Sequence, residues 1–137
     1  QAGLARLPVQ QAVLLLDVTL MTPSAAVQSG MKDPVLAPPV QARGKVLQLL
    51  GVSKVQEAHR YEHGKHGLFT YYLLKGLSGA ADQDHNGFVA LGELFDYARA
   101  QVSRTAKAEY ENEQEPACIP ALIPASREWN LPLTRVK

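Results

Sequence analysis

The expected fold is decided by one stretch, LFTYYLLKGLSGAADQDHNGFVALGELFDYARAQVSRTAKAEY, residues 68–110. Its first part, Leu68–Leu77, places apolar side chains on one face at helical spacing, and it is followed by Gly79, a residue type that commonly ends helices. Its last part, Leu91–Tyr110, repeats apolar residues at the same helical spacing along its length. The stretch therefore predicts two helices joined by a loop.

The loop between the predicted helices, Asp82–Glu93, matches the EF-hand pattern D-x-[DN]-x-[DN]-G-x5-E at every defined position. Oxygen atoms at loop positions 1, 3, 5, 7 and 12 would converge on one hard cation, and Gly87 at position 6 permits the sharp turn. The pattern predicts calcium as the cofactor. The predicted ligands are four side chains and, at position 7, a backbone carbonyl: Asp82, Asp84, Asn86, Glu93 and Phe88.

Two features of this loop argue for weak binding. Ala90 at position 9 has no side-chain oxygen, so a water molecule would have to supply that ligand. EF-hands normally occur in pairs, and the sequence contains a single loop of this kind. The alternative interpretation is a tight polar turn between two helices that binds no metal.

The remaining chain completes an α/β pattern. Gln11–Leu20 and Lys45–Ser53 are short apolar runs without polar alternation, which is typical of strands buried on both faces of a parallel sheet. Ala117–Ile123 is a candidate third strand. We therefore predict an α/β layered fold that forms a single domain over residues 1–137.

Three segments are expected to lack regular structure. Residues 22–44 contain four prolines and read as a linker-like loop. Gln56–Gly67 is polar and contains two glycines, so we expect a surface loop there. The tail, residues 125–137, carries the only tryptophan, Trp129, and is expected to be irregular.

Composition and charge exclude several classes of protein. The net charge is +1 over 137 residues, so we expect neither nucleic acid nor a membrane surface as a partner. The longest apolar run, residues 12–16, is far too short to span a bilayer. The single cysteine, Cys118, cannot form a disulfide within the chain, and its apolar, proline-flanked position favours a small buried hydrophobe over a nucleophile. We expect a cytoplasmic location.

Three segments of the chain resemble one known family. They are His66–Leu77, Gly92–Ala98 and Glu113–Pro116, and they are similar to the C-terminal half of bacterial caspase-like cysteine peptidases of the metacaspase and orthocaspase type. The resemblance extends roughly over residues 11–120. It implies part of a three-layer sandwich, in which a short, mainly parallel sheet packs with helices and which contains the EF-hand-like unit, residues 68–110.

The same resemblance indicates where the family's functional residues would fall. Asp17 matches the aspartate that helps form an acidic pocket for Arg or Lys side chains, so the resemblance implies a substrate-binding role. The nucleophile position holds Thr19 in place of cysteine, and a hydroxyl is much less acidic and less nucleophilic than a thiol. The family's histidine would lie upstream of Gln1. No catalytic residue is therefore predicted in this chain.

Three functions are compatible with these residues. The first is a degenerate caspase-like pseudopeptidase that binds calcium and acts as a binding or regulatory module, with a protein or peptide, a second copy or a complementing chain as partner. The second is the C-terminal part of an active caspase-like cysteine endopeptidase with Arg or Lys specificity whose catalytic residues lie elsewhere. The third is a calcium-binding module whose caspase-like ancestry is incidental.

A zinc site is the least favoured alternative. His59, His63 and His66 have a spacing that could gather three imidazoles on a continuous helix. Gly64 and Gly67 argue against a continuous helix, so a solvated loop is the preferred interpretation.

Overall fold

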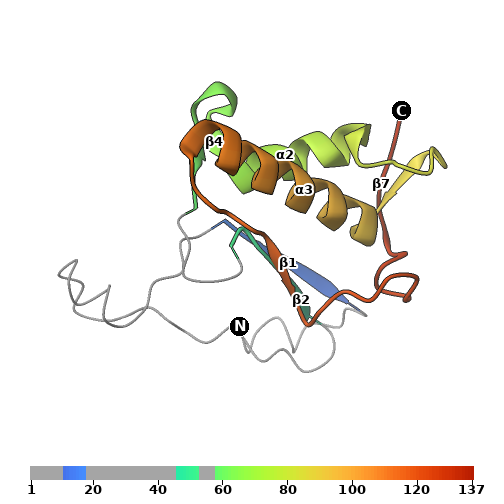
Figure 1. The fold of residues 1–137 in the computed structure, drawn as a ribbon. Helices are drawn as coiled ribbons and strands as arrows, with labels where there is room; N and C mark the ends of the chain where they lie inside the picture. Colours follow the sequence, from blue (N-terminus) through green and yellow to red (C-terminus); the bar gives the residue numbers. More distant parts are fainter. Residues whose placement is uncertain (1–10, 18–45, 53–57) are drawn as a thin grey trace.

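The computed structural model describes residues 11–17, 46–52 and 58–137. These residues form a mixed α/β structure, in which two α-helices lie on the same side of a small sheet (Figure 1). The predicted α/β class is therefore confirmed at this level, and the third layer of a sandwich stays a prediction. The predicted linker, residues 22–44, and Thr19 lie outside the described residues.

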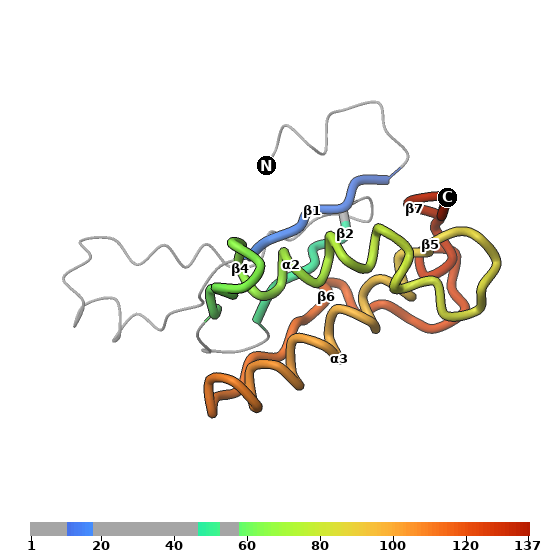
Figure 2. Tube along the Cα trace, turned by 90° about the horizontal axis from the view of Figure 1, so that it is seen from above, coloured from blue at the N-terminus to red at the C-terminus, as the bar shows by residue number. Residues whose placement is uncertain are grey.

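The main sheet of the described residues has the order β1 (Ala12–Leu16), β2 (Val46–Leu50) and β6 (Ala117–Ile119). β1 and β2 are parallel, whereas β6 is antiparallel to β2, with Leu49 opposite Cys118. The described sheet is therefore mixed, and a mainly parallel sheet stays a prediction. Two helices that run in opposite directions lie between β2 and β6 (Figure 2). A connection with one helix brings the chain back for a parallel strand, whereas the second helix reverses the chain again, so β6 enters the sheet antiparallel to β2.

The two helices follow the predicted boundaries closely. α2 spans Leu68–Lys75 and α3 spans Leu91–Tyr110. α2 continues into one wide helical turn, Gly76–Ala80, in which Gly79 has a φ of 124°. Glycine adopts this left-handed conformation readily, which explains why the helix ends there. Within the described ranges, no helix combines the length and apolar composition needed to cross a membrane.

The apolar core lies between the helices and the sheet. Leu68 and Phe69 of α2 and Leu49 of β2 are fully enclosed in one cluster with the apolar face of α3. Burying a side chain of this size contributes about 1.5–3 kcal/mol, so apolar packing holds the helices on the sheet. The buried face of α3 contains every residue that the spacing predicts: Leu91, Leu94, Phe95, Ala98, Val102 and Ala106.

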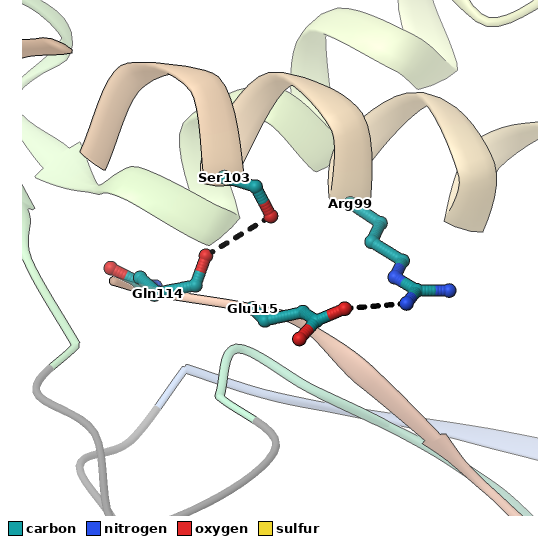
Figure 3. Close-up of polar contacts among 4 residues, drawn as sticks. All are labelled: Arg99, Ser103, Gln114 and Glu115. Atoms are coloured by element: carbon teal, nitrogen blue, oxygen red, sulfur yellow. Dashed lines mark hydrogen bonds and ion pairs between the residues drawn. The ribbon is translucent and has the colours of Figure 1, made fainter. Parts of the chain in front are cut away.

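The chain returns from α3 towards the sheet along the surface of the helix (Figure 3). The hydroxyl of Ser103 donates a hydrogen bond to the backbone carbonyl of Gln114 at 3.2 Å. The guanidinium of Arg99 forms an ion pair with the Glu115 carboxylate. These two contacts guide the returning chain into β6.

The buried side chain of Gln114 joins two segments that are distant in sequence. Its Oε1 accepts a hydrogen bond from the His59 backbone N–H at 2.8 Å, and its Nε2 donates to the Gly51 carbonyl at 3.0 Å. Because both ends of the buried amide are satisfied, Gln114 stabilises the contact between the end of β2 and the residues that precede α2.

The expected surface loop before α2 contains a short hairpin. β3 (Arg60–Tyr61) and β4 (His66–Gly67) are antiparallel and enclose a 3-10 turn, Glu62–Gly64. The prediction of a loop without strands is therefore wrong for these residues. Strands of two residues are too short to produce a recognisable alternation in the sequence.

The expected irregular tail also contains a strand. β7 (Pro132–Arg135) is antiparallel to β5 (Phe88–Ala90), which lies within the loop Asp82–Glu93, here called the acidic loop, directly before α3. Figure 2 shows the two strands beside each other at the same end of the helices. The prediction of an irregular tail is wrong for residues 132–135, because a pairing between segments so far apart in sequence leaves no local pattern.

Candidate metal centre

The acidic loop turns sharply after α2. His85 and Gly87 have positive φ values of 58° and 86°. The Asp82 carboxylate accepts hydrogen bonds from the backbone N–H groups of Asn86 and Gly87, at 3.2 and 3.1 Å. The loop is therefore wrapped around the carboxylate at its first position.

Three carboxylates converge at this loop and could hold a metal ion. One oxygen each from Asp82, Asp84 and Glu93 lies within 4.8 Å of the other two. Two oxygens on opposite sides of one calcium ion lie about 5 Å apart, because each Ca–O distance is about 2.3–2.6 Å. The spacing of the carboxylates therefore fits a single cation. Asp82 and Glu93 are half-buried and Asp84 is exposed, so the group remains open to solvent.

The carboxylate of Glu93 is positioned by the start of α3. Its Oε2 accepts a hydrogen bond from the Ala90 N–H at 2.9 Å, and its Oε1 accepts one from the Asp84 N–H at 3.4 Å. Glu93 lies in the first turn of α3, where the positive end of the helix stabilises a negative charge. A carboxylate has about four lone-pair sites, so these two bonds leave capacity to bind a cation.

The two other predicted ligand residues lie in the same turn. Asn86 Nδ2 donates to Asp84 Oδ2 at 2.8 Å, and Asn86 Oδ1 accepts from the Phe88 N–H at 2.8 Å. These bonds hold the Asn86 amide beside the Asp84 carboxylate. Phe88 belongs to β5, so its backbone is fixed by strand pairing with Arg135.

A cavity of about 520 Å³ adjoins the acidic loop. Its lining includes Asp84 and Glu93 from the predicted ligand set, Asp96 from α3 and Trp129 from the tail. Partial burial raises the pKa of Asp96, and the positive charge of Arg99 opposes that rise. The cavity gives a dissolved cation a route to the loop carboxylates.

The tail residues at this site were not predicted from the sequence. β7 places Thr134 opposite Val89 of β5. Trp129 packs so tightly on Gly92 that an added Cβ would lie 2.1 Å from the indole. A lone tryptophan in the tail was visible in the sequence, but no local pattern connects it to the glycine before Glu93.

Asp17 lies at the end of β1, against the start of α2. Its Oδ2 accepts hydrogen bonds from the backbone N–H and the hydroxyl of Thr70, at 3.1 and 2.7 Å. Gly67 approaches so closely that an added Cβ would lie 1.9 Å from this oxygen. Asp17 therefore caps α2 from a neighbouring strand, a role that the sequence did not indicate.

The predicted substrate-binding role of Asp17 stays a prediction. A cavity of about 410 Å³ beside Asp17 is also lined by Arg60 and Lys65. Two cationic side chains near the carboxylate disfavour the entry of a basic substrate group, because like charges repel.

The remaining candidate residues are Cys118 and three histidines. Burial raises the pKa of the Cys118 thiol to about 11, so the thiol stays protonated near neutral pH and is a poor nucleophile. His59, His63 and His66 do not form a metal-binding group. The part of the chain that the structure describes contains one cluster of three or more metal-ligating side chains, the carboxylates of the acidic loop.

No protein-family model, curated protein or solved structure matches this chain. Its function is therefore inferred from the geometry of its own residues.

Proposed function

We propose that this chain is a calcium-binding module built on a degenerate caspase-like scaffold. The observation that carries the proposal is the convergence of Asp82, Asp84 and Glu93, whose oxygens lie within 4.8 Å of one another in a loop with EF-hand spacing. Calcium neutralises these carboxylates and orders the loop, and the module then acts by binding a protein or peptide partner.

The donor set favours calcium over other divalent metals. The clustered ligands are all carboxylate oxygens, which suit Ca²⁺ and Mg²⁺, whereas Zn²⁺ and Cu²⁺ sites usually include nitrogen or sulfur. Mg²⁺ demands near-ideal octahedral geometry at about 2.1 Å, while Ca²⁺ accepts irregular coordination by about six to eight oxygens. The loop is partly exposed, and a water molecule must supply the ligand at position 9. Ca²⁺ tolerates such an irregular site better than Mg²⁺ does.

The scaffold part of the proposal rests on the resemblance of residues 11–120 to the caspase-like family. Thr19 stands at the nucleophile position, and the Cys118 thiol has a pKa raised to about 11. Asp17 is engaged with Thr70 at the start of α2. These features support a chain that keeps the scaffold without peptidase chemistry of its own.

A calorimetric titration with calcium tests the proposal. The wild type should bind one equivalent, and Glu93→Gln should weaken binding by at least about tenfold, because position 12 loses its charge and its second ligand oxygen. The glutamine keeps one carbonyl oxygen that can accept the Ala90 N–H, so the start of α3 should remain intact.

Glu109→Gln is the matched control. It removes the same charge from an exposed position near the other end of α3, so it should bind calcium as the wild type does. Absence of binding heat in the wild type, or equal losses in both variants, would contradict calcium binding by the loop. Cleavage of Arg- or Lys-terminated fluorogenic peptides that disappears in Thr19→Ala would overturn the pseudopeptidase part of the proposal.

A further inference from the structure

The C-terminal segment, residues 126–136, contacts the acidic loop on the side that leads into α3. β7 pairs with β5, and the Val136 N–H donates to the Gly87 carbonyl at 2.8 Å. This pairing fixes the backbone on both sides of Phe88, whose carbonyl is the predicted ligand at position 7. The segment therefore holds a part of the loop that must be rigid for a cation to bind.

The same segment also satisfies the first amides of α3. The Leu91 N–H donates to the Leu131 carbonyl, and the Gly92 N–H donates to the Trp129 carbonyl, each at 2.9 Å. The first N–H groups of a helix have no partner within the helix, so an external acceptor stabilises the helix start. Glu93 follows directly, and its position thus depends on where the segment docks.

A third set of contacts reaches the end of α2. The Thr134 hydroxyl donates to the Leu77 carbonyl at 2.9 Å. The Val136 side chain lies against Gly79, where an added Cβ would be 3.1 Å from Cγ1. The C-terminal segment therefore bridges the two helix ends between which the acidic loop is suspended.

We propose that docking of the C-terminal segment and calcium binding by the acidic loop are thermodynamically coupled, so that the segment acts as an internal partner that sets the affinity of the site. This inference rests on the proposed calcium function and adds its regulation. A docked segment fixes Phe88 and Glu93 before the ion arrives, so less conformational entropy is lost on binding. Coupling is reciprocal, so calcium must strengthen the docking of the segment by the same factor.

Trp129 makes the coupling measurable in the full chain. It is the only tryptophan, and it packs on Gly92, next to the ligand Glu93. Calcium titration should therefore change the tryptophan emission with the same midpoint as the calorimetric binding curve. Hydrogen exchange at the Leu91, Gly92 and Val136 amides should slow when calcium is bound.

Gly92→Ala tests the direction of the effect. The new Cβ would overlap the indole and displace the segment, while every predicted ligand residue is left unsubstituted. Alanine is a better helix former than glycine, so the substitution does not weaken α3 by itself. We expect calcium affinity to fall by about tenfold, which is in the usual range for coupled sites. Trp129→Ala should also weaken binding, and adding Gly92→Ala to it should cause little further loss.

The outcomes separate this inference from the proposed function. Wild-type affinity in Gly92→Ala, with an emission spectrum that shows Trp129 displaced, would overturn the coupling and leave calcium binding intact. If the wild type binds no calcium, the proposed function and the coupling both fail. If circular dichroism shows that Gly92→Ala does not fold, hydrogen exchange in the wild type tests the coupling instead. Equal exchange rates at the Leu91, Gly92 and Val136 amides with and without calcium would then overturn the coupling.

Discussion

Both helices begin beside a carboxylate, and the two sites differ in what surrounds that group. At α2, Asp17 accepts two hydrogen bonds from Thr70, and the adjoining cavity contains the cations Arg60 and Lys65. At α3, Glu93 lies within 4.8 Å of two other carboxylates. Both carboxylates accept backbone hydrogen bonds, but Glu93 also belongs to a group with an excess of negative charge.

The surroundings of each carboxylate therefore decide its role. A single carboxylate that accepts backbone and hydroxyl donors stabilises the folded chain directly. Three carboxylates held close together repel one another until a cation neutralises them. Changes at the Asp17 site should therefore alter folding stability, and changes in the acidic loop should alter calcium affinity.

The largest expected effect is at the Asp17 site. Gly67→Ala should lower the free energy of unfolding by about 3 kcal/mol, since overpacking a close contact costs up to about that amount. Gly67 has φ −59° and ψ 149°, which alanine adopts without strain, so the loss would come from the clash with Asp17. Urea unfolding of the wild type and of Gly67→Ala measures this loss in the free energy of unfolding. Gly51→Ala is the graded control, because its Cβ would lie 3.1 Å from Asp17 and should cost less.

A smaller loss is expected when the acceptor itself is removed. Asp17→Ala should cost about 2 kcal/mol, because the Thr70 N–H and hydroxyl lose their partner at the start of α2. Thr70→Ser keeps both donors and should unfold close to the wild type. Calcium affinity should not change in either variant. A parallel loss of calcium affinity in Asp17→Ala would show that the two sites are not independent.

The smallest free-energy change is expected in the acidic loop, and it should appear in binding. Asp84→Asn should weaken calcium binding by about tenfold, or about 1.4 kcal/mol, because one ligand loses its charge. In the presence of a chelator its unfolding free energy should stay within about 0.5 kcal/mol of the wild type. Asp96→Asn is the control, since Asp96 lines the same cavity outside the predicted ligand set. Equal losses in both variants would argue against ligation by Asp84.

Agreement between sequence and structure is best where the signal is local. The boundaries of α3, its buried face and the convergence of Asp82, Asp84 and Glu93 all follow from spacings within a few residues. β6 lies within the predicted third strand, Ala117–Ile123, but its antiparallel direction was not predicted. Agreement fails for β7, whose partner strand lies far along the chain. Asp17 was noticed because of a family resemblance, but its contact with Thr70 was not expected.

The helix–loop–helix follows from local sequence, because helical period and loop spacing are fixed by covalent geometry over neighbouring residues. The contacts at the start of each helix depend on how distant segments pack together. Asp17 reaches Thr70 across 53 positions, and the C-terminal segment reaches the acidic loop through backbone carbonyls and a four-residue strand. Backbone groups are the same in every residue, so a contact made through them carries no signature in the sequence.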